Sequence, residues 1–168
     1  MPDQNTSTSG GKIFVGSDHA GFGLKSKLIP YLKELGYEVE DKGAFEYKED
    51  DDYPDYIIPV AREISHRPND VRGIVLGGSG QGEGMAANKF SDVRATVFYG
   101  EKQCVVIEEH ESIIKISRAD NNANLLSLGA RFITEEEMRS AVKEWLDTPF
   151  KNEEKYQRRI SKMNRIHE

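Results

Sequence analysis

The chain has 168 residues, of which 37% are hydrophobic and 31% charged, and its formal net charge is −6 at pH 7. This balance is typical of one soluble domain that is long enough to bury a core. The acidic charge, with no basic stripe before the C-terminal tail, argues against nucleic acid as a partner. No apolar stretch could span a bilayer, no signal peptide is evident, and Cys104 is the single cysteine. We therefore expect a cytoplasmic protein with no membrane partner.

Short apolar runs alternate along the chain with segments of helical spacing. The runs predict five strands, at 12–16, 37–41, 73–76, 94–99 and 124–129. Helical spacing predicts helices at 24–35, 54–64, 85–89 and 134–146, and a charged helical arm from 152 to 168. Pro30 argues against an unbroken first helix, whereas Thr134 and Glu137 predict a capping box. Residues 101–118 fit a strand or a helix equally well.

The alternation of strands and helices indicates an α/β fold, namely a Rossmann-like α/β/α sandwich with a five-stranded parallel sheet and a C-terminal helical arm. Residues 1–11 are polar and rich in Ser, Thr and Gly, which predicts a disordered tail. We place the main domain at 12–150 and the arm at 151–168.

A glycine-rich loop, Gly77 to Gly84, follows the third predicted strand and precedes the short predicted helix at 85–89. This arrangement presents backbone N–H groups to an anion. A carboxylate repels phosphate, so Glu83 makes sense as a proton acceptor, while the N–H groups hold the oxyanion that forms. A glycine-rich turn without a ligand, or Glu83 as a helix cap only, is the alternative.

Three familiar loops do not fit this sequence. No register supplies the G-x-G-x-x-G of a dinucleotide fingerprint, and no glycine precedes Lys89 as a Walker A loop requires. Gln81 occupies the last glycine position of a G-x-S-x-G nucleophile elbow. No spacing of His, Cys or acidic residues indicates a metal site, and Asp50–Asp52 is interpreted as a solvated loop.

Six motifs in order resemble ribose-5-phosphate isomerase type B, in the family that includes the galactose-6-phosphate isomerase subunits. They are Val15–Gly21, Asp52–Tyr56, the glycine loop ending at Lys89, Asn121–Asn124, Leu128–Arg131 and Gln157–Arg159. The resemblance runs from Lys12 into the tail. It implies a homodimer with active sites shared between subunits, no metal or organic cofactor, and a sugar phosphate that is isomerised through a cis-enediolate.

The resemblance also implies roles for single residues. Many relatives carry a cysteine base at the position of Gly77, whereas the branch that this chain resembles has a glutamate base at Glu83. Ser79, with the N–H groups at Gly80, Gly82 and Glu83, matches the enediolate site, and Asp18 matches a ligand of a substrate hydroxyl. The matching substrate and phosphate ligands are His19, Gly78, Asn121 (from the partner subunit), Arg131, Lys155 and Arg159.

One departure concerns Asp120, where relatives carry a histidine that opens the furanose ring. An ordinary aspartate is ionised and is a poor acid near neutral pH. Ring opening is then slow, uses Asp18 or Asp120 with a raised pKa, or is unnecessary, as for a tetrose 4-phosphate. Ribose 5-phosphate is the expected substrate. The alternatives are a tetrose 4-phosphate, a hexose 6-phosphate, or a sugar-phosphate-binding protein with weakened catalysis.

Overall fold

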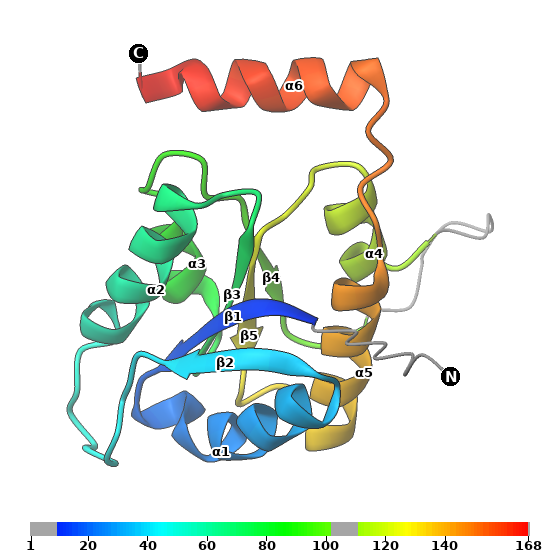
Figure 1. Cartoon of the computed structure of the whole chain (residues 1–168). Coiled ribbons are helices and arrows are strands. Elements are labelled where there is room, and N and C mark those ends of the chain that lie inside the picture. The colour runs from blue at the N-terminus through cyan, green and yellow to red at the C-terminus, as the bar shows by residue number, and fades with distance from the viewer. Residues whose placement is uncertain (1–9, 102–110, 168) are drawn as a thin grey trace, which may run out of the picture.

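The computed structural model describes residues 10–101 and 111–167, and it contains one sheet of five parallel strands (Figure 1). The strand order is β2-β1-β3-β5-β4, and every neighbouring pair is parallel. The strands are β1 (Gly10–Ser17), β2 (Tyr37–Asp41), β3 (Val71–Gly77), β4 (Ala95–Phe98) and β5 (Leu125–Gly129). The predicted α/β sandwich with a five-stranded parallel sheet is therefore confirmed.

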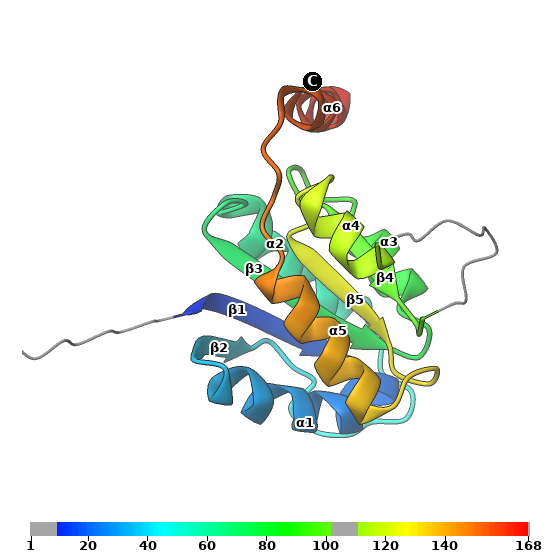
Figure 2. The ribbon, with the colours of Figure 1, turned by 90° about the vertical axis from the view of Figure 1, so that its right-hand side faces the viewer.

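Helices cover both faces of this sheet, as Figures 1 and 2 show. The helices are α1 (His19–Glu34), α2 (Pro54–His66), α3 (Gln81–Ala87), α4 (Ile113–Ala119), α5 (Glu135–Asp147) and α6 (Glu154–Asn164), which a 3₁₀ turn at Arg165–His167 follows. Helices α1, α4 and α5 pack on one face, and α2 and α3 pack on the other.

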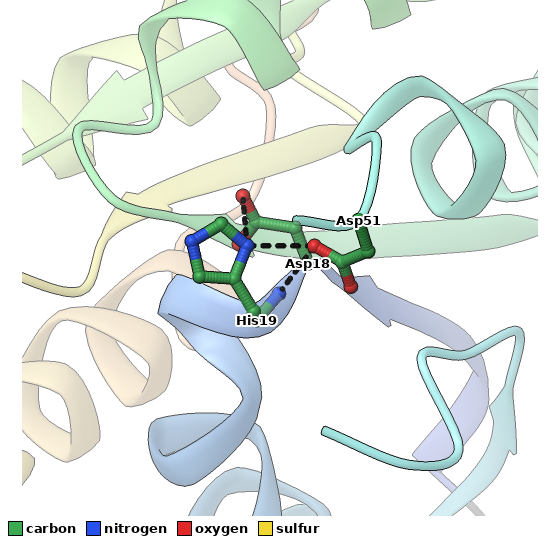
Figure 3. A group of neighbouring side chains, drawn as sticks. All are labelled: Asp18, His19 and Asp51. Carbon is green, nitrogen blue, oxygen red and sulfur yellow. Dashed lines mark hydrogen bonds and ion pairs between the residues drawn. The ribbon is translucent and has the colours of Figure 1, made fainter. Parts of the chain in front are cut away.

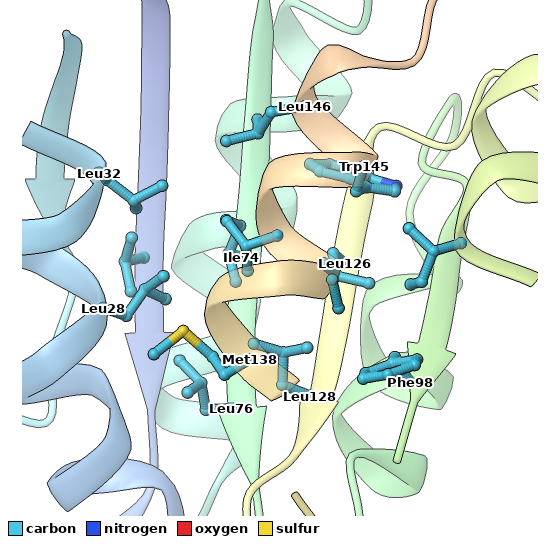
Figure 4. Close-up of a cluster of buried hydrophobic side chains, with 14 of the residues drawn as sticks. Leu28, Leu32, Ile74, Leu76, Phe98, Leu126, Leu128, Met138, Trp145 and Leu146 are labelled. Carbon is cyan, nitrogen blue, oxygen red and sulfur yellow. The ribbon is translucent and has the colours of Figure 1, made fainter. Parts of the chain in front are cut away.

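Each strand divides its side chains between the two cores, because successive residues of a strand point to opposite faces. Ile74 and Leu76 of β3 join the core under α1 and α5, which Figure 4 shows together with Trp145. Val75, between them in sequence, joins the core under α2. A sheet that is buried on both faces explains why its strands are continuous apolar runs in the sequence.

Helix α1 begins at His19, five residues before the first predicted position, and it runs through Pro30. Asp18 starts it, since its carboxylate accepts a hydrogen bond from the Gly21 backbone N–H at 3.1 Å. Proline removes one backbone hydrogen bond, whereas Leu28 and Leu32 are fully buried on the helix's inner face. Burial of the apolar face outweighs the lost hydrogen bond.

Two further predictions concern helix ends. The capping box of α5 is confirmed, because Thr134 Oγ1 accepts from the Glu137 N–H and Glu137 Oε2 accepts from the Thr134 N–H. The ambiguous segment is helical from Ile113 to Ala119, and Ser112 caps it, while residues 102–110 lie outside the described part. Strand β1 begins at Gly10, so the last two residues of the predicted tail are ordered, and residues 1–9 lie outside the described part.

Helix α6 confirms the predicted helical arm, and Figure 1 shows it standing away from the sheet at the end of an extended segment. None of its residues is buried, although Tyr156, Ile160 and Asn164 are half-buried. Within the described residues, no helix combines the length and apolar character needed to cross a membrane.

Candidate active site

The candidate site lies at the carboxyl ends of β1, β3 and β5. Strand β2 lies on one side of β1 and β3 on the other, so the chain changes direction between β1 and β3. Crevices at such a point are the usual ligand sites of open α/β sheets. In the register of the sheet Ser17 pairs with Leu76, and Gly77 pairs with Gly129. The three following loops therefore start at one level.

The glycine loop turns directly into helix α3, which begins at Gln81 and ends at Ala87. The prediction of a helix at 85–89 was wrong by four residues at its start. Gly80 adopts a left-handed conformation with φ of 74°, and the Ser127 hydroxyl of β5 donates a 2.6 Å hydrogen bond to its carbonyl. This long-range contact fixes the turn. Glu83 consequently lies in the first turn of α3.

The Glu83 carboxyl group is buried, with the residue only 4% exposed. Burial raises its pKa above the ordinary value of 4.5, and repulsion from Asp18 acts in the same direction, whereas its own backbone N–H opposes them. The N-cap residue of α3 is Gly80, which has no side chain, and the Glu83 carboxyl lies in the first turn beside its own backbone N–H. A buried carboxyl with a raised pKa is a stronger base than an exposed one.

Gly77 leaves the space that this carboxyl fills. A Cβ added at Gly77 would overlap Oε1 and Cδ of Glu83 and would lie 2.7 Å from Oε2. The carboxyl therefore occupies the place of a side chain at residue 77, the position at which the family resemblance implies a cysteine base in many relatives. Residues 77 and 83 cannot both carry a side chain at this point.

A second group of side chains adjoins this loop, as Figure 3 shows. The Nδ1 atom of His19 lies 2.7 Å from Asp51 Oδ1 and 3.9 Å from Asp18 Oδ2. The same Asp51 oxygen accepts from the His19 backbone N–H at 3.0 Å. The hydrogen bond to Asp51 is the main cause that raises the pKa of His19 above 6.5.

Asp51 was missed by the sequence reasoning, which interpreted Asp50–Asp52 as a solvated loop. Its side chain is only 3% exposed, and its Oδ2 atom is buried without a hydrogen-bond partner. The contact with His19 spans 32 residues of sequence. The one local signal is its position directly before the Asp52–Tyr56 motif on which the family resemblance rests.

Arg131 brings a second positive charge to the site. A Cβ added at Gly78 would lie 3.3 Å from Arg131 Nη1, so the guanidinium lies over the glycine loop. Its positive charge repels protonated His19 and so acts to lower the pKa of that ring. Tyr53 closes another side, because a Cβ added at Gly82 would lie 2.9 Å from the Tyr53 ring. Two cationic groups around an N–H-rich loop suit a phosphate.

The fold thus brings together eight of the predicted site residues at one edge of the sheet: Asp18, His19, Gly78, Ser79, Gly80, Gly82, Glu83 and Arg131. Ser79 is exposed, and its hydroxyl accepts a 3.3 Å hydrogen bond from the Gln81 N–H.

The other four predicted residues lie elsewhere in the chain. Asp120 and Asn121 follow α4 and precede β5, so they lie at the opposite, amino edge of the sheet, and Lys155 and Arg159 lie on α6. The Lys151 ammonium donates to Asp120 Oδ1 at 2.8 Å and lowers the pKa of that carboxyl. The raised pKa considered for Asp120 is therefore contradicted. Within one chain these residues do not complete the site.

One group among the described residues has ligand atoms close enough for a metal ion, namely Asp18, His19 and Asp51, within 4.8 Å of one another. Hydrogen bonds within this cluster already account for its closeness, since His19 is bonded to Asp51 and Asp18 accepts from Gly21. The absence of a metal cofactor stays a prediction.

A buried carboxyl, an oxyanion-type loop and two cations at the edge of a parallel sheet define a class of α/β protein that binds a phosphorylated small molecule and can move a proton on it. The chain matches the model of the Ribose/Galactose Isomerase family over residues 13–163. It belongs to that family.

Similar proteins cover almost the whole chain. The chain is 37% identical over 163 residues to ribose-5-phosphate isomerase B of Mycobacterium tuberculosis H37Rv, which is 95% of this chain and 94% of that protein. It is 36% identical over 155 residues to ribose-5-phosphate isomerase B of Escherichia coli K12, and these residues are 92% of this chain and 95% of that protein. The structure of the Mycoplasma genitalium enzyme with bound ribulose-5-phosphate superposes with a TM-score of 0.83 at 34% identity, covering 93% of this chain and 95% of that one.

Proposed function

We propose that this protein is an aldose–ketose isomerase that interconverts ribose 5-phosphate and ribulose 5-phosphate through a cis-enediolate. The observation that carries the proposal is the buried Glu83 carboxyl, which fills the space above Gly77 beside the amide-rich loop. The relatives named ribose-5-phosphate isomerase B, and the similar structure with bound ribulose-5-phosphate, support this substrate.

In this mechanism Glu83 removes the proton from C2 of the open-chain aldose. The C2–H electron pair forms the C1–C2 double bond, and the carbonyl electrons move to O1, which gives the enediolate. The hydroxyl of Ser79 and the N–H groups at Gly80 and Gly82 stabilise that charge. The 2-hydroxyl proton passes to O1, and Glu83 returns its proton to C1, which leaves the ketone at C2.

The phosphate is bound by His19 and Arg131, and Asp18 holds a hydroxyl of the sugar. Asp51 keeps the ring of His19 in place through Nδ1, which leaves Nε2 free to face the phosphate. Gly78 brings the loop backbone close to the guanidinium of Arg131.

We further propose a cytoplasmic homodimer whose partner subunit completes each site. Asp120, Asn121, Lys155 and Arg159 lie far from Glu83 along the fold, and α6 has no buried residue of its own. Such an arm gains stability by packing against a second copy. The partner subunit's Asn121 then contacts the sugar, and the partner subunit's Arg159 and Lys155 contact the phosphate.

Mixing two inactive variants tests this sharing. In a heterodimer of Glu83→Ala and Arg159→Ala chains, one site lacks both groups and the other has both. When equal amounts of the two variants are mixed at random, roughly a quarter of all sites should therefore have both groups. Homodimers of each variant, assayed at low substrate concentration, are the controls. If the mixture is no more active than the two variants alone, the sites are not shared.

A tetrose 4-phosphate is the second candidate substrate, and one observation favours it. Lys151 holds Asp120 ionised, so Asp120 is poorly suited to open a furanose ring. A tetrose 4-phosphate cannot form that ring, because its C4 oxygen is esterified. Turnover of ribose 5-phosphate and of erythrose 4-phosphate by the wild-type protein should be compared. Efficient turnover of ribose 5-phosphate supports the proposal, turnover of the tetrose alone replaces it, and turnover of neither favours a hexose 6-phosphate or a binding protein.

A further inference from the structure

A cavity of about 420 Å³ lies at the amino edge of the sheet, on the side opposite the candidate active site. It is lined by the starts of β1 and β3, the turn before β3, and the ends of α4 and α5, and its lining residues include Arg72 and Arg118. Nothing in the proposed isomerisation uses this cavity.

Arg72 and Arg118 carry charges with no acidic partner among the described residues. Arg118 is only 5% exposed, and the neighbouring Arg94 is 8% exposed. Burial, together with repulsion from Arg72 and Arg94, lowers the pKa of Arg118 to about 10. Buried cations without a counter-ion are costly, and they are rare unless something pairs with them.

In both guanidinium groups, the donors without a hydrogen-bond partner are Nε and Nη2, which lie on one edge of the group. Arg72 uses Nη1 to donate to the Leu146 carbonyl at the end of α5, and Arg118 uses Nη1 to donate to Asn122 and Ala123. In both, the Nε–Nη2 edge has no hydrogen-bond partner in the described chain, and Arg118 Nε is buried. This edge is the fork with which arginine binds phosphate or carboxylate oxygens in pairs.

Other charges near the cavity leave that fork available. Lys12 lines the cavity, but its ammonium is paired with Glu38 at 3.1 Å and with Glu40 at 2.7 Å. Asp70 also lines it, yet Asp70 is exposed and forms no ion pair with either arginine. The cavity therefore combines an excess of positive charge with unused donors.

From this arrangement we infer that the cavity is a second anion site, in which Arg72 and Arg118 bind a phosphate-type oxyanion. The anion accepts hydrogen bonds from the Nε–Nη2 edge of Arg72 and from Nη2 of Arg118, because Arg118 Nε is fully buried, and it offsets the repulsion among the arginines. The site is separate from the substrate phosphate site, because Arg131 and His19 lie at the opposite edge of the sheet.

The chain carries a built-in reporter for this site. Trp145 is its single tryptophan. The guanidinium carbon of Arg72 lies 5.6 Å from the Trp145 ring, and that of Arg118 lies 5.7 Å from it. An anion that binds these groups changes the charge against the indole, so the fluorescence of Trp145 should follow binding.

The test is a titration of the full chain with inorganic phosphate at constant ionic strength, read by Trp145 fluorescence. We expect a saturable change that sodium chloride does not reproduce. Arg72→Met keeps an apolar stem against Trp145 and removes the fork, so it should weaken phosphate binding by about tenfold or more. Arg118→Lys keeps the charge without the fork and should also weaken binding. Arg62→Met, which removes one exposed arginine on α2, is the matched control.

Arg131→Ala distinguishes phosphate binding in the active site from phosphate binding in the cavity. In this variant the fluorescence titration should be unchanged, while competitive inhibition of isomerisation by phosphate should be relieved. Arg72→Met should show the reverse pattern. The inference is overturned if phosphate leaves Trp145 fluorescence unchanged, if sodium chloride acts equally, if Arg72→Met binds phosphate as tightly as Arg62→Met does, or if Arg131→Ala abolishes the signal.

Discussion

Replacing Gly77 by alanine should inactivate the enzyme while leaving Glu83 in the sequence. The added Cβ overlaps Oε1 and Cδ of Glu83 and lies 2.7 Å from Oε2, whereas ordinary van der Waals contacts begin near 3.4 Å. The carboxyl must therefore move by about 1 Å or more, and misplacement on this scale costs about 10²-fold in rate. Complete loss of a general base costs about 10²–10⁴-fold. We expect kcat for ribose 5-phosphate to fall within that range, with KM little changed.

The assay is steady-state isomerisation, with thermal unfolding measured alongside. Overpacking by one methyl group should destabilise Gly77→Ala by about 1–3 kcal/mol. The Gly77→Ala/Glu83→Ala double variant removes the overlap, so it should recover stability and be no less active than Glu83→Ala alone. Gly23→Ala is the matched control, because a Cβ there meets no atom within 4 Å, and it should keep full activity. Activity of Gly77→Ala within a few-fold of wild type would refute this account of the site.

Three further changes have defined outcomes. Asp51→Asn removes the hydrogen bond to the Asp51 carboxylate that raises the pKa of His19. Protonated His19 binds phosphate and loses its charge as pH rises through its pKa, so the rise of KM with pH should begin at a lower pH than in wild type. An unchanged KM–pH profile would show that Asp51 does not set the charge of His19. Asp120→His supplies a group that can gain or lose a proton near neutral pH, so kcat should increase for ribose 5-phosphate and not for erythrose 4-phosphate. Equal effects on both substrates would show that residue 120 takes no part in ring opening. Thr134→Ala breaks the capping box of α5 and should cost about 1 kcal/mol of unfolding free energy, measured by denaturant titration, with activity kept.

Local patterns were sufficient to predict the strands, because a parallel sheet buried on both faces requires continuous apolar runs. They failed where a distant residue decides the local structure. The start of α3 at Gln81 depends on Gly80 and on a hydrogen bond from Ser127, which lies 47 residues away. The continuity of α1 through Pro30 depends on burial of its leucines against the sheet. Neither can be inferred from the segment itself.

The candidate site shows the same division. Residue type and spacing were enough to propose Glu83 as a base, but its burial against Gly77 follows from the register of β3 and β5. Asp51 was missed because three consecutive aspartates are typical of a solvated loop. The separation of Asp120 and Asn121 from Glu83 follows from topology, since residues before a parallel strand lie at the edge opposite those after one.

The central claim is that the buried Glu83 carboxyl moves the proton of a sugar phosphate. The most direct measurement is kcat for ribose 5-phosphate in wild type and in Glu83→Gln, with binding of the sugar phosphate measured in both. Glutamine keeps the size of the side chain but cannot accept the proton. The account predicts a fall in kcat of at least about 10²-fold with binding retained. Equal turnover by the two proteins would contradict it.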